Sequence, residues 1–406
     1  MKVAMLHWAF PPIIGGVESH LAMLGPELVR YGCKVSLLTG SVNGREEEYT
    51  WRGMRIYRSN LFDLNTLTPS TLSRKAKDIY AVLERFIAEV KPDILHAHNM
   101  HYFSTEHADA LYALKRAYSV PCVLTAHNVW EDELGSEFNR RAGYWDAVIA
   151  VSHYIKKELV KAGYDGEKIT VIHHGIDLDL FSPDGQARNA AKVVLPFSGR
   201  RVIFHPARMS LAKGSHICVQ ALAYIKERFP DVLLVMAGTE KTVDWGNCQA
   251  GEIAGVKKMI ADLGLMENVY IEFFSWDKMP HVYRSAEICV YPSCFEEPFG
   301  LVMLESMATA RPIVVSAAGG MPEVVKDGVN GFVVPKGDAR ALAERCCRLL
   351  ADPLLAKRIG ERGRSIVKKE FTRELMTSRT LRVYGDVLVS RRAGGTSGTS
   401  KKKFIA

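Results

Sequence analysis

The segment KVAMLHWAFPPIIGGVESH, residues 2–20, has the strand–turn–helix order that decides the fold class. It starts with a short apolar run, residues 2–7, and continues through a turn that contains Pro11, Pro12, Gly15 and Gly16. A helical pattern follows over residues 17–31. A short run that is apolar throughout is typical of a strand buried on both faces of a parallel sheet. The segment therefore predicts an α/β protein.

The same alternation of strand and helix continues along the chain and then restarts. In the first half, helical segments at 71–90 and 152–162 lie between further apolar runs at 34–39, 93–96, 122–125, 146–151 and 168–173. The second half has such runs at 201–205, 232–237, 269–273, 287–291 and 312–316. This pattern predicts two Rossmann-like domains, each with a doubly wound parallel sheet, that face an interdomain cleft.

The boundary between the halves lies where Pro183, Gly185, Pro196 and Gly199 interrupt the periodicity. The resulting division has five parts: an N-terminal domain at 1–185, a linker at 186–200, a second domain at 201–370, a helix at 371–392 and a tail at 393–406. We expect the helix to pack back on the N-terminal domain. The tail contains GGTSGTS and is predicted to be flexible.

Composition and charge exclude several classes of protein. The 406 residues are 48% hydrophobic, yet no stretch approaches the roughly 18–20 apolar residues of a spanning helix. The N-terminus lacks a cleavage site and no CxxC pair exists, which favours a cytoplasmic, reduced protein without structural zinc. The net charge of +8 comes from residues 357–406. A solvated helical face explains this surplus, and peripheral membrane contact is the alternative. No interleaved aromatic and basic pattern indicates nucleic-acid binding, and nothing in the sequence indicates an oligomeric state.

Two glycine-containing loops after predicted strands carry groups suited to an anion. At Gly15-Gly16 the backbone can approach a ligand beside a helix N-terminus, although a simple tight turn explains the pair equally well. In ARMSLAKG, residues 207–214, the guanidinium of Arg208 and the ammonium of Lys213 suit a diphosphate. Two surface cations are the alternative for this loop. It does not match GxxxxGK[ST], which disfavours an ATPase.

The strongest functional pattern is PSCFEEPFGLVMLESMA, residues 292–308. A strand ends at Pro292, and a helix whose first amides can hold a phosphate begins at residues 299–301. Glu297 precedes this helix, and Glu305 lies more than one turn into it. Two carboxylates spaced in this way can bind separate hydroxyl groups of an elongated ligand, with its phosphates between them.

The string EPFGLVMLESMA, with GGMPEVV and DGVNGFVVP after it, resembles the donor-site signature of the family-4 retaining glycosyltransferases of the GT-B fold. The resemblance extends over HAHN (96–99), TAHN (125–128), HHGIDLDLF (173–181) and ARMSLAKG. Three positions depart from the family pattern: Ala207 and Ala310 replace glycines, and Ser275 replaces a common glycine in the loop of the base pocket.

The resemblance implies a hexosyltransferase that moves a sugar from a nucleoside-diphosphate sugar to a sugar or small-molecule acceptor. It implies retention of anomeric configuration and no metal or other cofactor, and we favour a UDP-sugar. The implied catalytic residues are His127, Arg208, Lys213 and Glu297. The implied donor-binding residues are Gly15, Gly16, Arg208, Lys213, Phe274, Ser275, Glu297, Phe299, Gly300, Leu301 and Glu305. The acceptor-side candidates are His98, Asn128 and Glu131.

Several alternatives stay open. The acceptor could be lipid-linked or a cell-surface polysaccharide, and the acidic run that contains Glu131 raises the hypothesis of a cationic acceptor. A nucleotide-sugar epimerase of GT-B-like fold is a distant alternative.

Two patterns could bind a metal. They are the histidines of 96–107 and the DxD string Asp177–Asp179. Their spacing favours strand-end histidines and a turn, respectively, so no metal site is predicted.

Overall fold

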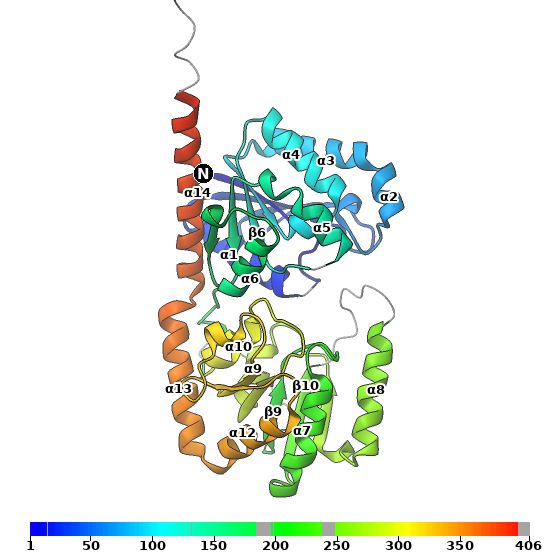
Figure 1. Cartoon of the computed structure of the whole chain (residues 1–406), viewed down its shortest axis with the longest axis vertical. Helices are drawn as coiled ribbons and strands as arrows, with labels where there is room; N and C mark the ends of the chain where they lie inside the picture. The colour runs from blue at the N-terminus through cyan, green and yellow to red at the C-terminus, as the bar shows by residue number, and fades with distance from the viewer. Residues whose placement is uncertain (14, 131, 184–195, 198, 238–247, 397–406) are drawn as a thin grey trace, which may run out of the picture. The chain divides into compact units, whose positions relative to one another are not determined.

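The computed structural model describes residues 1–13, 15–130, 132–183, 196–197, 199–237 and 248–396. The chain divides into two compact units. The first unit comprises Met1–His173 and Arg373–Ala406, and the second comprises His174–Thr372. Each unit is an α/β sandwich with helices on both sides of a sheet (Figure 1).

The described strands of the first unit form one sheet in the order β3-β4-β2-β1-β5-β6-β7-β8. Their bounds are β1 Lys2–Leu6, β2 Lys34–Gly40, β3 Glu48–Trp51, β4 Met54–Ser59, β5 Ile94–His98, β6 Cys122–Ala126, β7 Ala147–Ala150 and β8 Ile169–Val171. All pairs are parallel except β3 with β4. The register puts Val3 of the central strand beside Val35 on one side and Ile94 on the other.

The helices of the first unit connect these strands. They are α1 Gly16–Arg30, α2 Pro69–Arg74, α3 Ala76–Val90, α4 Thr105–Ala117, α5 Glu133–Asn139, α6 His153–Lys161 and α14 Arg373–Thr396, with short 3-10 turns at η1 Asn60–Phe62, η2 Met100–Tyr102, η3 Ala142–Tyr144 and η4 Gly166–Lys168. The helix predicted over 71–90 is two helices, because α2 ends at Arg74 and α3 begins at Ala76, with Lys75 as the cap between them.

The described strands of the second unit form an all-parallel sheet in the order β11-β10-β9-β12-β13-β14. Their bounds are β9 Arg201–His205, β10 Val232–Ala237, β11 Val269–Glu272, β12 Ile288–Tyr291, β13 Ile313–Ser316 and β14 Phe332–Val334. The helices are α7 Ser215–Arg228, α8 Cys248–Asp262, α9 Met279–Ser285, α10 Leu301–Ala308, α11 Met321–Val324, α12 Ala339–Ala351 and α13 Pro353–Glu370, with η5 at Met266–Asn268. The prediction of two doubly wound parallel-sheet domains is therefore confirmed.

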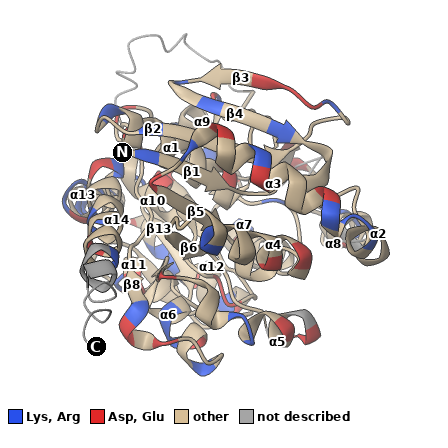
Figure 2. Ribbon diagram, turned by 90° about the horizontal axis from the view of Figure 1, so that it is seen from above, with Lys and Arg blue, Asp and Glu red and all other residues tan. Residues whose placement is uncertain are grey.

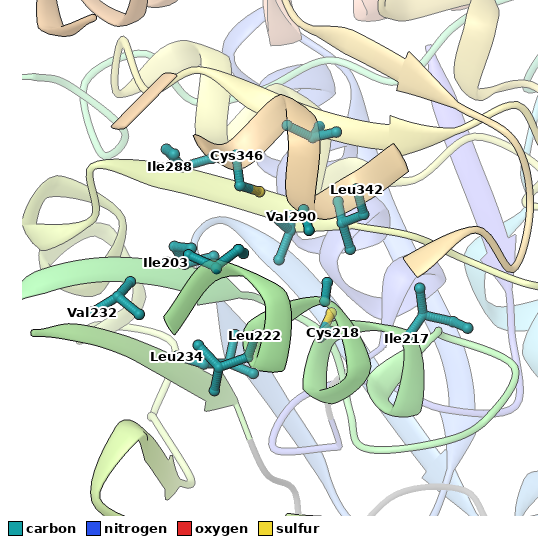
Figure 3. Packing of buried hydrophobic residues seen from close by; sticks show 14 of the residues in the cluster. Ile203, Ile217, Cys218, Leu222, Val232, Leu234, Ile288, Val290, Leu342 and Cys346 are labelled. Atoms are coloured by element: carbon teal, nitrogen blue, oxygen red, sulfur yellow. The ribbon is translucent and has the colours of Figure 1, made fainter. Parts of the chain in front are cut away.

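The core of the second unit lies between this sheet and helices α7 and α12. Ile203, Leu234 and Val290 project from neighbouring strands toward Cys218 of α7 and Cys346 of α12 (Figure 3). Burial of large aliphatic side chains contributes about 1.5–3 kcal/mol each. This packing fixes the central strands, and with them the loops that leave their carboxyl ends.

The C-terminal helix α14 belongs to the first unit. The Tyr384 hydroxyl lies 2.5 Å from His96 Nδ1, and Arg373 Nε lies 3.5 Å from Glu27 Oε2 of α1. The division of the chain falls after His173, twelve residues before the expected end of the first domain, because Ile176 is bonded to Phe371 within the second unit. Residues 393–396, expected in the tail, are still helical. Most of the expected linker and the rest of the tail lie outside the described residues.

Among the residues that the structure describes, no helix is both long enough and apolar enough to cross a membrane.

Candidate functional site

The candidate site of the second unit lies at the carboxyl edge of its sheet. Strand β9 pairs with β10 on one side and with β12 on the other, so the strand order reverses between β9 and β12. Ligands of open α/β sheets bind outside the strand ends at such a reversal. The loop that carries Arg208 and Lys213 follows β9, and the loop that carries Glu297 follows β12.

The structure brings Lys213 and Glu297 together. Lys213 Nζ lies 2.6 Å from Glu297 Oε2, which also accepts a hydrogen bond of 2.7 Å from the Tyr291 hydroxyl. Both charged side chains are largely buried, with exposed fractions of 18% and 11%. Burial and the neighbouring Glu297 carboxylate raise the pKa of Tyr291 well above its usual range, so its hydroxyl stays protonated and donates. The pair places one cation and one anion, already oriented, at the strand edge.

Two glycines allow the loops of this site to approach closely. Gly214 has φ +76°, and a Cβ on it would lie 2.0 Å from Pro292 O. A Cβ on Gly319, which has φ +52°, would lie 2.2 Å from Glu297 O. Gly320 N donates to that same carbonyl at 2.8 Å. Glycine at these positions therefore lets the turn after β13 hold the backbone of Glu297 in place.

A buried network fixes the loop before Lys213. His205 Nδ1 lies 3.1 Å from Val290 O, and His205 Nε2 lies 3.3 Å from Ser215 Oγ. Ser215 Oγ accepts from Ser210 N at 3.1 Å, and Ser210 Oγ accepts from Lys213 N at 3.1 Å. Burial lowers the pKa of His205 to about 4, so the ring is neutral and serves as a structural link between β9, β12 and the loop.

Helix α10 begins at Leu301, four residues after Glu297. Its N-cap is Gly300, with φ +87°, which supplies no side-chain oxygen to the first turn. The backbone N–H groups of that turn, beginning at Leu301, are thus available for an anion. Phe299 is buried, and its ring packs edge-on against His174 at 5.0 Å.

Glu305 lies further along α10 and accepts a hydrogen bond of 2.5 Å from the Tyr283 hydroxyl of α9. Burial raises the pKa of the Glu305 carboxyl to about 7, and the Tyr283 hydrogen bond acts in the opposite direction. The group is therefore poised between its neutral and ionised forms near neutral pH.

The remaining predicted donor residues of this unit differ in exposure. Arg208 is exposed beside Tyr291, where its charge favours the ionised phenol. Phe274 is buried, with its ring 6.4 Å from that of Phe204. Ser275 O accepts from Lys278 N at 2.9 Å. The exposed aromatic of this loop is Phe273, with 51% exposure, and sequence reasoning did not select it.

The first unit holds its predicted residues at the carboxyl ends of β1, β5 and β6. After β1, His7 Nε2 lies 2.9 Å from Glu18 Oε1 of α1, and His7 Nδ1 lies 3.2 Å from His98 O. A Cβ on Gly15 would lie 2.3 Å from Glu18 Oε2, whereas Gly16 faces open space. Gly16 is thus the glycine of this pair whose surroundings leave room for a ligand.

His98 and His127 meet in the interior of the first unit. His98 Nδ1 lies 3.2 Å from His127 Nε2, and the rings of both lie within 5.5 Å of the ring of His20 from α1. Asn99, in the left-handed region at φ +54°, accepts from His127 N at 2.8 Å through its side chain. His98, predicted as an acceptor-side residue, is completely buried within the first unit.

Of the other acceptor-side candidates, Asn128 directly follows His127 in the chain. The carbonyl of Asn128 lies 2.7 Å from His101 Nε2, and Glu131 lies outside the described residues. Asp132 caps α5 by accepting from Gly135 N at 2.7 Å, and Glu137 pairs with Arg140 at 3.0 Å. Asp132 and Glu137, which belong to the same acidic run as Glu131, therefore have structural partners.

The patterns rejected as metal sites also have structural roles. Asp177 Oδ1 accepts from the backbone N of Asp179 at 3.0 Å, which confirms the predicted turn. His107 is buried, with Nε2 2.8 Å from Leu61 O. His96 Nε2 lies 2.7 Å from Thr125 Oγ1. None of these histidines shares a candidate metal cluster with His98 in the part of the chain that the structure describes.

Three residues that contact the predicted site residues of the two units were not predicted from the sequence: Tyr291, Tyr283 and His20. Tyr291 is the last residue of a predicted strand, where its position before the loop could have indicated it. Nothing in the local sequence pairs Tyr283 with Glu305 or His20 with His98, because each pair joins elements that are distant in the chain.

Comparison with known proteins identifies the chain by family. Residues 14–180 match the model of Glycosyltransferase Family 4, and residues 187–366 match that of Glycosyl transferases group 1. The α-maltose-1-phosphate synthase of Mycobacterium tuberculosis is 29% identical over 95% of this chain and all of its own length.

Two solved structures share the fold. The sucrose-phosphate synthase of Thermosynechococcus elongatus has a TM-score of 0.80 at 22% identity and covers 96% of this chain and 99% of its own. A protein of Anabaena, solved in complex with UDP-glucose, has a TM-score of 0.71 at 20% identity and covers 96% and 100%.

Proposed function

Because the chain belongs to the family-4 glycosyltransferases of the GT-B fold, we propose that it transfers a sugar from a nucleoside-diphosphate sugar, preferably a UDP-sugar. The proposed acceptor is a sugar or small molecule, the anomeric configuration is retained, and no metal ion takes part. That the chain is a glycosyltransferase follows from the family. The donor, stereochemistry and acceptor are the proposed part.

The observation that carries the proposal is the Lys213–Glu297 pair at the strand-order reversal, beside the N-terminus of α10. A sugar nucleotide carries two phosphates between a nucleoside and a sugar, so it needs cations in the middle and hydroxyl acceptors at both ends. Arg208 and Lys213 supply the cations. Glu297 supplies an acceptor for sugar hydroxyls, and Glu305 supplies one for ribose hydroxyls.

The preference for a UDP-sugar is supported by the Anabaena protein of the same fold, which was solved with UDP-glucose. Ser275, in the loop after β11, is a residue of this chain that would adjoin the base.

In the proposed mechanism the second unit stabilises the leaving group. As the glycosidic bond breaks, negative charge grows on the β-phosphate, and Lys213, Arg208 and the amides of α10 receive it. No carboxylate at the candidate site of the second unit is proposed as a nucleophile. The departing phosphate oxygen deprotonates the acceptor on the face that it leaves, which retains the configuration. His127 and Gly16 of the first unit contact the transferred sugar and the donor phosphate in this proposal.

The test is donor turnover by Lys213→Ala. We expect kcat for release of nucleoside diphosphate to fall by about 100-fold or more, in line with loss of a preorganised charge donor. Lys258→Ala is the matched control, because Lys258 pairs with Asp262 on the exposed surface of α8 at 2.6 Å. Turnover of Lys213→Ala equal to that of Lys258→Ala, measured in the presence of EDTA, would refute the proposal.

A further inference from the structure

Three buried histidines converge in the interior of the first unit. They are His20, His98 and His127, with one nitrogen of each lying within 4.8 Å of the others. We call them the histidine cluster. They come from α1 and from the ends of β5 and β6, so the fold of the sheet, and not the local sequence, brings them together.

Burial favours the neutral form of two of these rings, His20 and His98. Burial, reinforced by the neighbouring His7, lowers the pKa of His20 to about 3. Burial and the surrounding histidines lower the pKa of His98 well below its usual range. A neutral imidazole has the lone pair that a metal ion needs, so binding at neutral pH does not have to displace a second proton from these two rings.

The spacing of the nitrogens is that of ligands on one metal ion. Two imidazole nitrogens bound to a tetrahedral Zn²⁺ at about 2.0–2.1 Å are about 3.3 Å apart. His98 Nδ1 and His127 Nε2 are 3.2 Å apart. The ligand nitrogen of His20 lies within 4.8 Å of the other two. This distance is at most about 1.5 Å longer than the spacing of two nitrogens on a tetrahedral Zn²⁺, and side-chain rotation can close the difference.

The second ring nitrogen of His98 bears on which nitrogen this side chain can offer. His98 Nε2 is fully buried and has no hydrogen-bond partner among the described residues. A buried polar atom without a partner is destabilising. No second hydrogen bond therefore fixes the tautomer of His98, and the ring can present a lone pair from either nitrogen.

Charge and coordination number define what the site would hold. Glu18 is 5% exposed and bonded to His7, whose field reaches both His20 and His98. Glu18 thus places a carboxylate beside His7, whose other ring nitrogen lies 3.2 Å from His98 O. Three protein ligands with an open fourth position are typical of zinc sites that keep a water or another exchangeable ligand.

We propose that the histidine cluster is a Zn²⁺ site of the form His₃ plus one exchangeable ligand, and that its occupancy inhibits sugar transfer. The inhibition rests on the proposed function, since Zn²⁺ would occupy the His127 nitrogen that faces the sugar. The binding itself does not rest on it. The site is regulatory, so transfer without metal and inhibition by zinc are compatible.

The binding test uses Co²⁺ as a spectroscopic probe on protein stripped with EDTA and then dialysed. We expect one Co²⁺ per chain, with the intense visible absorption of a four-coordinate site, and displacement of it by Zn²⁺. His20→Gln should weaken Co²⁺ binding by more than about 100-fold, since it removes a direct ligand and loss of an outer-shell partner already costs 10–100-fold. His107→Gln, a buried histidine of the same unit outside the cluster, should bind as the wild type does.

The outcomes separate the two proposals. Absence of the Co²⁺ spectrum in the wild type, or its persistence in His20→Gln, would overturn the metal site, and neither result depends on catalysis. Zinc should reduce donor turnover of the wild type by about tenfold or more, and EDTA should restore it. At the same zinc concentration, the donor turnover of His20→Gln should stay close to the turnover of that variant in EDTA. Absence of turnover in EDTA with a normal Co²⁺ spectrum would refute the proposed function alone.

Discussion

At the scale of single residues, the orientation of Glu297 depends on two donors of different kinds. Lys213 contributes charge, and Tyr291 contributes a directed hydrogen bond at 2.7 Å from the end of β12. Tyr291 itself is buried at 3% exposure and cannot be reached by a large ligand. Its role in the site is therefore to position the Glu297 carboxylate.

We expect Tyr291→Phe to lower kcat/KM for the donor by roughly tenfold, since a hydrogen bond to a charged group contributes about 1.5–3 kcal/mol. The Lys213 pair remains, so the fold should persist. Steady-state kinetics with varied donor measures the effect, and Tyr57→Phe, which removes a hydroxyl bonded to Glu89 in the first unit, is the control. Equal kcat/KM values in both variants would contradict the positioning role.

Glu305 gives a prediction about pH. Because burial raises its folded-state pKa to about 7, the native protein retains a proton that the unfolded chain releases near its ordinary pKa. This contribution to stability is complete below about pH 4.5 and is lost as the pH rises through 7. Between pH 5 and 8 the wild type should lose up to about 3 kcal/mol that Glu305→Gln does not lose, and less if water reaches the carboxylate. Urea unfolding of both proteins measures the difference, and parallel pH profiles would contradict it.

At the scale of elements, the strands were predictable where they are central and apolar. The eleven runs proposed from sequence overlap strands, because residues buried on both faces of a parallel sheet leave a continuous apolar signal. The antiparallel hairpin β3–β4 was missed, since Glu48–Trp51 alternates between exposed and half-buried positions at the sheet edge. Its two-residue turn, Arg52-Gly53 with φ +47° and +82°, was a detectable signal.

For the candidate site, the sequence predicted which loops lie near each other but not which side chains are buried. The loops with Lys213 and Glu297 follow adjacent strands, so strand order alone brings them near each other. The burial of His98 and Phe274 could not be read from the sequence, because it depends on which elements cover them. The convergence of His20 with His127 likewise joins α1 to the loop after β6, which the local sequence does not pair.

The end of α10 gives a prediction about stability. Ala310 follows the C-cap Thr309 with φ +56°, a position that favours glycine, and its N–H bonds to Met307 O at 2.9 Å. Ala310→Gly should therefore raise the free energy of unfolding by about 1 kcal/mol. Ala356→Gly, in the interior of α13, should lower it by about 1 kcal/mol. Chemical denaturation measures both changes, and a loss of stability in Ala310→Gly would contradict the strain at this position.

At the scale of the whole molecule, charge is distributed unevenly over the chain. The surplus of basic residues is C-terminal, and helix α13 of the second unit exposes Lys357, Arg358, Arg362, Lys368 and Lys369 (Figure 2). In the first unit, α3 carries both acidic and basic residues, α4 has its acidic residues before its basic ones, and the charged residues of α5 are acidic (Figure 2). The cations of the candidate donor site, by contrast, lie at the carboxyl edge of the second sheet, where Glu297 already pairs with Lys213.

A ligand that binds only the folded protein stabilises it by about 2.7 kcal/mol at 100 times its dissociation constant. We therefore expect one nucleoside diphosphate among UDP, GDP and ADP, with UDP favoured, to raise the unfolding temperature of the wild type. The corresponding monophosphate should have a smaller effect, because it offers one phosphate to Arg208 and Lys213. Thermal unfolding with each nucleotide measures this, and equal effects of monophosphate and diphosphate would contradict diphosphate recognition.

The central claim is that the second unit binds the leaving nucleotide at the junction of β9 and β12, and a crystal structure with the bound diphosphate tests it most directly. The account predicts the two phosphates beside Arg208, Lys213 and the first turn of α10, with the ribose at Glu305. A nucleotide bound elsewhere on the molecule, with the Lys213–Glu297 pair intact and unoccupied, would contradict it.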